Sequence, residues 1–168
     1  MTSNYITYCS AKKRESGKWT PDKLYISQRI DRFVERCKDK SLDWAIFSAL
    51  YGFFFPQQKK SAYDVTMKTD YDYWLGVAVI RNKEKLSRVE SEKHLSQLIR
   101  KIKQQAKDRD IDRIFFYGPS PMMMRCYLEV LHYAFDDCSV VHGWKELQQH
   151  IEEDSNVIKV IHKISDIR

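Results

Sequence analysis

The sequence predicts an α/β domain in three layers, with a mainly parallel central sheet and helices on both faces. Residues 44–50 are almost continuously apolar, which suits a strand buried on both faces and is too short to span a membrane. Strand-like runs then alternate along the chain with stretches whose apolar residues recur at helical spacing. Because 168 residues suffice for one substantial core, we expect a single α/β domain over residues 1–168.

The first third of the chain reads as strand, loop and helix. A short strand is expected over residues 5–9, followed by a polar and basic loop over residues 10–23. A helix should begin after Ser27, a favourable N-cap residue, because apolar residues recur behind it up to Cys37. This helix gives way to the central strand at residues 38–41.

The central strand should end in a sharp turn at Tyr51 and Gly52, since glycine supplies the backbone freedom that a turn needs. Residues 57–72 are polar and predict a long loop across the mouth of the sheet, where long loops are often functional. Residues 73–80 fit either a strand or the start of a helix, with Gly76 and the paired valines slightly favouring a strand.

The second half begins with the clearest helix of the chain. Ser87 and Glu90 form a capping-box pattern, and a single apolar stripe follows them. Residues 111–117 then predict a strand, and residues 118–121 a sharp turn into a third helix. The remaining expectations are a strand over residues 138–142 and a short helix containing Leu147 and Ile151. The tail over residues 156–164 fits both a helix and a strand.

Composition favours an anionic partner and a reducing compartment. A formal charge of +6 and a pI near 9.1 suit nucleic acid or a phosphorylated small molecule. The four cysteines include no Cys-x-x-Cys pair, so neither a disulfide framework nor a metal site is predicted, and the cytoplasm is the expected location. No secretion signal or membrane-spanning run is visible. The glycine pattern of a P-loop or dinucleotide loop is absent, so no cofactor is predicted.

Candidate functional residues gather where the predicted strands end. Right-handed crossovers bring these strand exits to one edge of the sheet, where α/β proteins bind their ligands. Cys9, Lys12 and Asp64 are the candidate catalytic residues, as a thiol nucleophile, an amine nucleophile or phosphate partner, and an acid or base. The predicted ligand-binding residues are Ser10, Lys13, Tyr25, Ser27, Ser48, Tyr51, Gly52, Tyr63, Gly118 and Ser120.

Plainer interpretations stand beside these assignments. The lysines can belong to a basic loop without a ligand, and a cysteine at a strand end is commonly a small buried hydrophobe. Most aspartates in loops stabilise local turns. The turn at residues 118–121 offers backbone N–H groups to an anion but is equally an ordinary helix entry, with Ser120 as its N-cap.

Four segments carry a resemblance to a known family. They are Cys9-Ser-Ala-Lys-Lys13, Leu24-Tyr-Ile-Ser27, Ser48-Ala-Leu-Tyr-Gly52 with Pro56, and Tyr63-Asp64-Val-Thr66. In order and spacing they resemble an uncharacterised domain family of bacteria, archaea and phages. The resemblance covers residues 9–67. Because that family has no settled activity, the resemblance implies a fold more readily than a function.

Two more distant similarities point toward nucleobases. The cysteine, lysine, tyrosine and serine pattern is similar to that of the archaeosine synthase core domain, which modifies a 7-deazaguanine base in tRNA, although residues 28–31 lack its histidine. The segment Gly118-Pro-Ser-Pro121 resembles the His-Pro-Ser-Pro loop of uracil-DNA glycosylases, with glycine in place of histidine. The water-activating aspartate of those enzymes has no counterpart after the first strand. The similarity implies a uracil-DNA glycosylase-like or related fold.

Three functions follow as hypotheses. The first is a domain that processes a nucleobase, nucleoside or nucleic acid, with the lysines on an anionic group and Asp64 as acid or base. The second is a non-catalytic nucleic-acid-binding domain whose exposed aromatics stack on bases, with Tyr51, Phe53, Phe54 and Tyr63 as candidates. The third is a small-nucleotide-binding protein that uses the Gly118 turn. The oligomeric state is not indicated.

Overall fold

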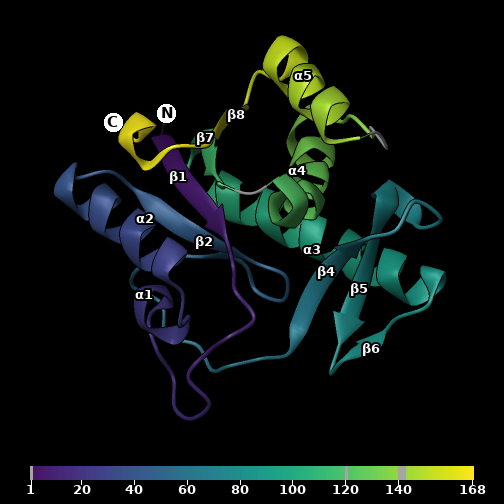
Figure 1. The fold of residues 1–168 in the computed structure, drawn as a ribbon, viewed down its shortest axis with the longest axis horizontal. Coiled ribbons are helices and arrows are strands. Elements are labelled where there is room, and N and C mark those ends of the chain that lie inside the picture. The colour runs from purple at the N-terminus through teal and green to yellow at the C-terminus, as the bar shows by residue number, and fades with distance from the viewer. Residues whose placement is uncertain (1, 120, 140–142) are drawn as a thin grey trace.

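The chain folds around a five-stranded sheet with the strand order β3-β2-β1-β7-β8 (Figure 1). The computed structural model describes residues 2–119, 121–139 and 143–168. The strands of this sheet are β1 (Thr2–Tyr8), β2 (Trp44–Ser48), β3 (Gly52–Phe54), β7 (Ile111–Tyr117) and β8 (Ile158–Ile161). Three pairings are parallel, whereas β3 runs antiparallel to β2. The α/β class is thus confirmed, and the expectation of a mainly parallel sheet is corrected to a mixed sheet.

The antiparallel edge arises because the predicted strand over residues 44–50 stops at Ser48. The Ser48 hydroxyl oxygen accepts hydrogen bonds from the backbone N–H groups of Leu50 (3.1 Å) and Tyr51 (2.9 Å), which turns the chain. Gly52 then adopts a positive φ of 73° and the chain returns along β2 as β3. All five residues of β2 are buried, as expected for a strand covered on both faces.

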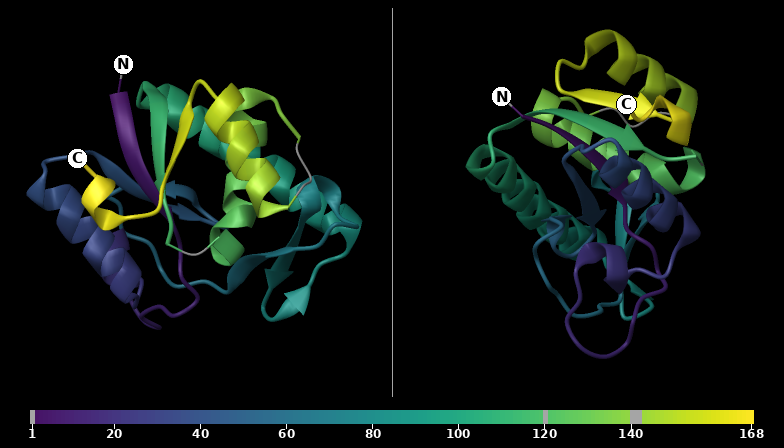
Figure 2. Two further views of the ribbon diagram at one scale, coloured as in Figure 1. Left: turned by 45° about the horizontal axis from the view of Figure 1, so that its top comes forward. Right: turned by 90° about the vertical axis from the view of Figure 1, so that its left-hand side faces the viewer.

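Helices cover both faces of the sheet (Figure 2). They are α1 (Pro21–Leu24), α2 (Gln28–Asp39), α3 (Arg88–Asp108), α4 (Pro121–Asp136) and α5 (Trp144–Asp154). α2 packs on one face, and α3 and α4 lie on the other. The N-caps predicted at Ser27 and Ser87 are confirmed, because Ser27 accepts from the N–H of Ile30 and Ser87 from that of Glu90. None of the helices within the described ranges is long and apolar enough to cross a lipid bilayer.

A second, antiparallel sheet begins inside the segment predicted as a long loop. It consists of β4 (Val65–Thr69), β5 (Val77–Arg81) and β6 (Glu84–Lys85) in that order, with a 3₁₀ turn at Trp74–Gly76 before β5. The loop prediction over residues 57–72 is therefore wrong for residues 65–69. β4 is only partly buried and contains polar residues. Its sequence is therefore not recognisable as a strand unless its pairing with β5 is known.

The C-terminal part differs from expectation at one strand. Cys138 and Ser139 are not in a strand, and the rest of the predicted strand, residues 140–142, lies outside the described residues. The position beside β7 is taken instead by β8, which belongs to the tail whose sequence fits both a helix and a strand. Its parallel pairing with β7 requires a crossover, and α4 and α5 supply it.

We predict that Gly52→Ala destabilises the protein by about 2–4 kcal/mol. A methyl group at residue 52 would have to adopt the unfavourable φ of +73° and would lie 2.7 Å from Oε1 of Gln105 and 3.0 Å from Ile102. That Gln105 oxygen accepts from the N–H of Phe53, so its displacement would also break a hydrogen bond of β3. Urea unfolding at 25 °C measures the loss.

Gly17→Ala is the matched control for backbone strain. Gly17 has a φ of +87°, but an added methyl group there would meet only the Trp19 ring, at an ordinary 3.4 Å. We expect a cost of about 1 kcal/mol from strain alone. Equal losses in the two variants would contradict the role assigned to the contact with Gln105.

Candidate functional site

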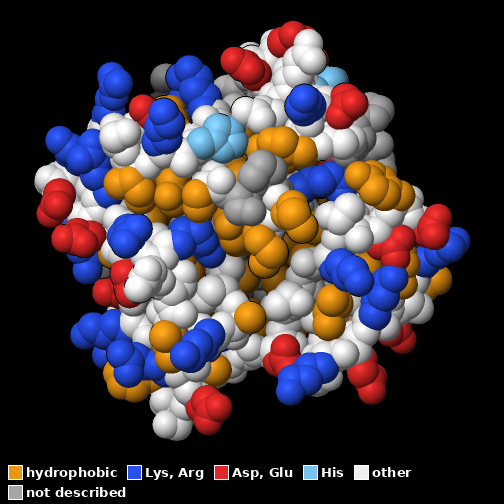
Figure 3. Space-filling model, viewed as in Figure 1, with side chains coloured by type: hydrophobic (Ala, Val, Ile, Leu, Met, Phe, Trp, Pro, Cys, Tyr) orange, Lys and Arg blue, Asp and Glu red, His pale blue; other side chains and the backbone are white. Residues whose placement is uncertain are grey.

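A cleft of about 800 Å³ lies at the carboxyl end of β1. From β1 the chain crosses over to β2 on one side, whereas β7 lies on the other, and the helices that follow β1 and β7 pack on opposite faces of the sheet. Such a reversal of strand order is where open α/β sheets form ligand crevices. The start of α2, the start of α4 and strand β4 complete the walls. Figure 3 shows hydrophobic side chains at the centre of this face, with Lys and Arg side chains around them.

Arg29 is the central cation of the cleft. Its guanidinium lies 3.6 Å from the centre of the Tyr8 ring, and the Tyr8 ring stacks in turn on Tyr127 at 5.5 Å. Arg29 donates hydrogen bonds to the hydroxyl of Thr7 (2.6 Å) and to the carbonyl of Tyr8 (2.9 Å). The Thr7 hydroxyl donates onward to the carbonyl of Tyr117 on β7 (2.8 Å). These contacts hold the arginine rigidly at the junction of α2, β1 and β7.

Cys9, the first residue after β1, brings a thiol to the floor of the cleft. Its sulfur lies 3.2 Å from the hydroxyl oxygen of Tyr127, and both side chains are buried. Burial, with the nearby Cys9, raises the pKa of Tyr127 well above its usual value. The phenol therefore stays protonated at neutral pH and is able to donate a hydrogen bond to sulfur.

Behind the thiol lies a chain of hydroxyl groups from three predicted site residues. The hydroxyl of Ser48 donates to that of Tyr63 at 2.7 Å, and the hydroxyls of Tyr63 and Tyr25 are 2.6 Å apart. Burial is the main cause that raises the pKa of both tyrosines, and the neighbouring Cys9 raises it further. The network is therefore neutral, and it connects the exits of β1 and β2 to the segment before β4.

Lys13 lies over this network. Its ammonium nitrogen is 4.2 Å from the centre of the Tyr63 ring. Burial lowers the pKa of Lys13, while the nearby Cys9 and Asp64 partly oppose that shift. The side chain of Lys12, by contrast, is exposed. Of the two lysines, Lys13 is therefore the one beside the thiol.

Some of the remaining predicted site residues line the cleft, and others lie outside it. Ser10 and Ser27 line the cleft, whereas Asp64 is exposed and is not among its lining residues. The Tyr51 hydroxyl donates to the carbonyl of Ser61 at 2.9 Å, and Gly52 lies opposite Ser48 across the β2–β3 turn.

Gly118 lies at the carboxyl end of β7, on the edge that β1 and β2 also reach, because the three strands run parallel. It is buried, and a methyl group there would lie only 2.5 Å from the Met124 sulfur. The strand exits thus share one edge, as predicted. Ser120 lies outside the described residues.

Phe53 and Phe54 are fully buried. They belong to the core between the sheet and its covering elements, so neither can stack on a base. This corrects that part of the nucleic-acid-binding hypothesis.

Sequence reasoning missed the charged residues of the cleft. Arg29 follows the N-cap of α2, and no pattern distinguishes it from the other basic residues. Arg125 and Glu129 lie one turn apart on α4 and form a buried ion pair with 3.3 Å between Nη2 and Oε1. Their i,i+4 spacing beside the predicted apolar stripe was the only available signal.

The carboxyl group of Glu129 has a strongly raised pKa. Burial raises the pKa of its carboxyl group to about 7, although the charge of Arg125 acts in the opposite direction. Near neutral pH the carboxyl group is therefore only partly ionised. The guanidinium of Arg125 also lies 4.9 Å from the centre of the Tyr71 ring in the cleft.

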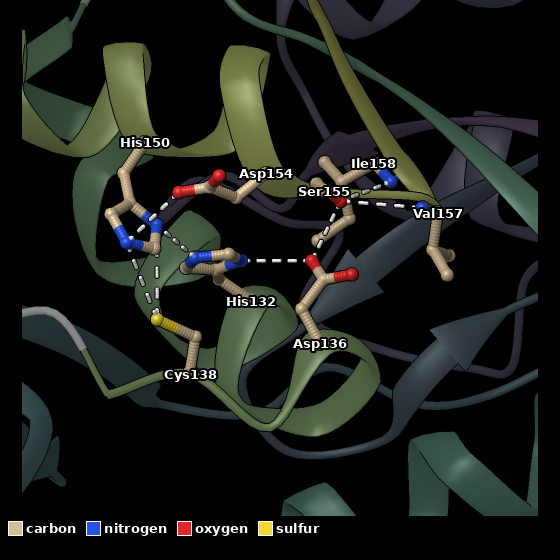
Figure 4. A network of polar contacts seen from close by, with 8 residues as sticks. All are labelled: His132, Asp136, Cys138, His150, Asp154, Ser155, Val157 and Ile158. Carbon is tan, nitrogen blue, oxygen red and sulfur yellow. Dashed lines mark hydrogen bonds and ion pairs between the residues drawn. The ribbon is translucent and has the colours of Figure 1, made fainter.

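A second polar cluster lies near the other end of α4 (Figure 4). His132 from α4, Cys138 from the segment after it and His150 from α5 bring three potential metal-ligating atoms within 4.8 Å of one another. The cysteine spacing predicts no metal site. These three residues come from two helices and the segment between them, and they meet because α5 packs on α4.

Comparisons with family models, with curated proteins and with solved structures found no match to this chain.

We predict that Glu129 makes the protein less stable as the pH rises. The folded protein binds the carboxyl proton of Glu129 more tightly than the unfolded chain does. The contribution of Glu129 to the free energy of unfolding is therefore fully present below about pH 4.5, and it is lost as the pH rises through about 7. The loss reaches up to about 3 kcal/mol, at 1.36 kcal/mol for each pKa unit. Urea unfolding between pH 5 and pH 8 measures it.

Glu129→Gln is nearly isosteric and does not titrate, so its free energy of unfolding should decline less over the same pH range. Groups that titrate elsewhere contribute equally to both proteins and cancel in the difference. Parallel pH profiles for the variant and the unmodified protein would exclude Glu129 as the source.

Proposed function

We propose that the cleft binds a nucleotide, either free or as an unpaired residue of a nucleic acid, within a domain that processes nucleobases, nucleosides or nucleic acids. One observation carries the proposal. The described residues that line the cleft include Arg29, Lys68 and Arg125 and no carboxylate, together with aromatic and methionine side chains. A site of this composition suits a ligand with an anionic group and a flat apolar body.

The anionic group of the ligand would bind at Arg29. Among the described residues no carboxylate pairs with Arg29, which contacts a hydroxyl, backbone carbonyls and the Tyr8 ring. Its guanidinium is already fixed by these contacts, so little side-chain entropy is lost when an anion binds. Lys68 adds positive charge from β4 on the opposite wall.

The base would lie against the apolar part of the cleft. Among the described residues, three of the five exposed large hydrophobic side chains line this one cleft: Tyr71 (60% exposed), Met122 (86%) and Met123 (63%). Large apolar side chains that remain exposed together commonly mark a binding surface. An aromatic ring and flexible thioethers suit the face of a nucleobase.

Chemistry on the bound ligand would use Cys9, whose thiol lies on the cleft floor beside a phenol donor and is the candidate nucleophile. Lys13 has a lowered pKa but is not among the lining residues, so it would act through Cys9 rather than through contact with the ligand. Asp64 is exposed outside the cleft lining, which leaves it a role through Lys13 rather than through contact with the ligand.

The proposal extends to the fold family and to the type of base. A uracil-DNA glycosylase-like fold is supported by the position of Gly118 at the end of β7 and by the cleft of about 800 Å³ at the carboxyl end of β1. A 7-deazaguanine-type base is suggested by the similarity of the cysteine, lysine, tyrosine and serine pattern. A non-catalytic nucleic-acid-binding role would use the same cleft without Cys9.

We predict that a nucleoside 5′-monophosphate binds more tightly than either the matching nucleoside or inorganic phosphate. Isothermal titration calorimetry with the four ribonucleoside monophosphates, their nucleosides, phosphate and a short single-stranded oligonucleotide measures this. Affinity should fall with added salt because phosphate contacts release counterions. Tighter binding of the oligonucleotide than of any monophosphate would identify nucleic acid as the ligand.

Arg29→Gln should weaken binding by about 10–100-fold, the effect of losing hydrogen bonds to a charged group. Lys101→Gln, on the exposed face of α3, is the matched control and should bind normally. Circular dichroism and thermal melts establish that both variants are folded. Equal affinity of Arg29→Gln and the unmodified protein, or no binding of any probe, would refute the proposal.

A further inference from the structure

His132, Cys138 and His150 form a cluster of nitrogen and sulfur donors on the surface between α4 and α5 (Figure 4). Nε2 of His132 lies 3.1 Å from Nδ1 of His150. The Cys138 sulfur lies 3.7 Å from that same His150 nitrogen. Imidazole nitrogen and thiolate sulfur are the ligands that zinc prefers in proteins.

The separations match those of ligands around one tetrahedral ion. With Zn–N bonds of about 2.0–2.1 Å and Zn–S bonds of about 2.3 Å, tetrahedral angles place two nitrogens about 3.3 Å apart and nitrogen and sulfur about 3.6 Å apart. The observed 3.1 Å and 3.7 Å lie within a few tenths of an ångström of these values. The third separation, between the ligand atoms of His132 and Cys138, is at most 4.8 Å, so this pair has to approach by up to about 1.2 Å for all three to coordinate one ion.

Two carboxylates orient the imidazoles for coordination. Nδ1 of His132 lies 2.8 Å from Asp136, and Nε2 of His150 lies 3.3 Å from Asp154. Each carboxylate thus faces one nitrogen of its imidazole ring, and the other two ring nitrogens face each other at 3.1 Å, on the side where a metal ion would bind. Carboxylate–histidine pairs of this kind accompany most zinc-bound histidines.

Asp136 is itself held in place. The Ser155 hydroxyl donates to its Oδ2 at 2.6 Å, and the Ser155 oxygen accepts from the N–H groups of Val157 (3.2 Å) and Ile158 (2.9 Å). The outer shell of the cluster is thus tied to the start of β8. Such support is expected for a site whose ligand geometry matters.

We propose that His132, Cys138 and His150 bind one Zn²⁺ ion, which fastens α5 to α4. Water completes the tetrahedron at the fourth position. His132 lies five residues beyond Tyr127, the last residue of α4 that lines the cleft, which is about 7.5 Å along the helix at 1.5 Å rise per residue. None of the three proposed ligands is among the described residues that line the cleft. α5 begins with Trp144, which lines the cleft, and the zinc clip therefore stabilises one wall of that site from a distance.

The metal alone is the probe. The full-length chain is stripped with a chelator under reducing conditions and titrated with Zn²⁺ against a chromogenic competitor. We expect one equivalent per chain and a rise in melting temperature of about 5–10 °C at a hundredfold excess over the dissociation constant. Co²⁺ should give the visible bands of a four-coordinate ion and a thiolate charge-transfer band in the near ultraviolet.

Three variants probe the cluster. Cys138→Ser and His150→Gln remove ligands and should weaken zinc binding by more than about 100-fold, because changes to outer-shell groups alone cost about 10–100-fold. Asp136→Asn tests the outer shell and should lie in that lower range. His150 is 36% exposed, so its replacement should leave the fold intact. Cys138→Ser should also abolish the charge-transfer band.

His162→Gln and Cys126→Ser are the matched controls, since both residues lie outside the cluster. They should bind zinc as the unmodified protein does. Absence of stoichiometric zinc uptake would overturn the proposal and would leave a proton shared between the two histidines as the explanation of their contact. Zinc uptake that survives both Cys138→Ser and His150→Gln would overturn it equally, because the ion would then lie elsewhere.

Discussion

The guanidinium of Arg29 lies where the carboxyl end of β1 meets the start of α2, and the cleft is arranged around it. Its contacts with Thr7, Tyr8 and the carbonyl of Cys9 fix α2, the longer helix of the crossover, against β1 at the centre of the sheet. Because Thr7 also bonds to Tyr117, the same contact reaches β7. A half-buried cation that is held by a ring, a hydroxyl and carbonyl oxygens keeps its full charge, and that charge faces the cleft.

Burial sets the electrostatics of the whole region. It raises the pKa values of Tyr25, Tyr63 and Tyr127, and it lowers that of Lys13. Each shift favours the neutral form. The tyrosine hydroxyls around Cys9 therefore form a neutral network, while Arg29 and Lys68 supply positive charge to the cleft. A neutral floor with nearby cations suits a ligand that has an anionic end and an apolar end.

α4 connects the two candidate sites. Its first turns contribute Met122, Met123 and Arg125 to the cleft, and its last turns contribute His132 and Asp136 to the proposed zinc site. Between them lies Glu129, a buried carboxyl group with a pKa near 7. The helix thus carries polar groups along a side that faces α5 and the cleft rather than solvent. Such groups lower stability unless a ligand or a metal compensates them, which explains their concentration on one element.

The sequence by itself determined the α/β class, the starts of α2 and α3 and the shared edge of Cys9, Ser48 and Gly118. Apolar periodicity, N-cap side chains and parallel strand exits are local features, or follow from handedness. Tertiary structure alone decided the rest. β4 needed its partner β5 to be recognisable, and β3 depended on a serine hydroxyl that turns the chain. Arg29 and the His132, Cys138 and His150 cluster owe their roles to neighbours distant in sequence. The burial of a side chain, the charges around it and its distance to other ligand atoms depend on the folded structure. The spacing of residues along the chain does not determine them.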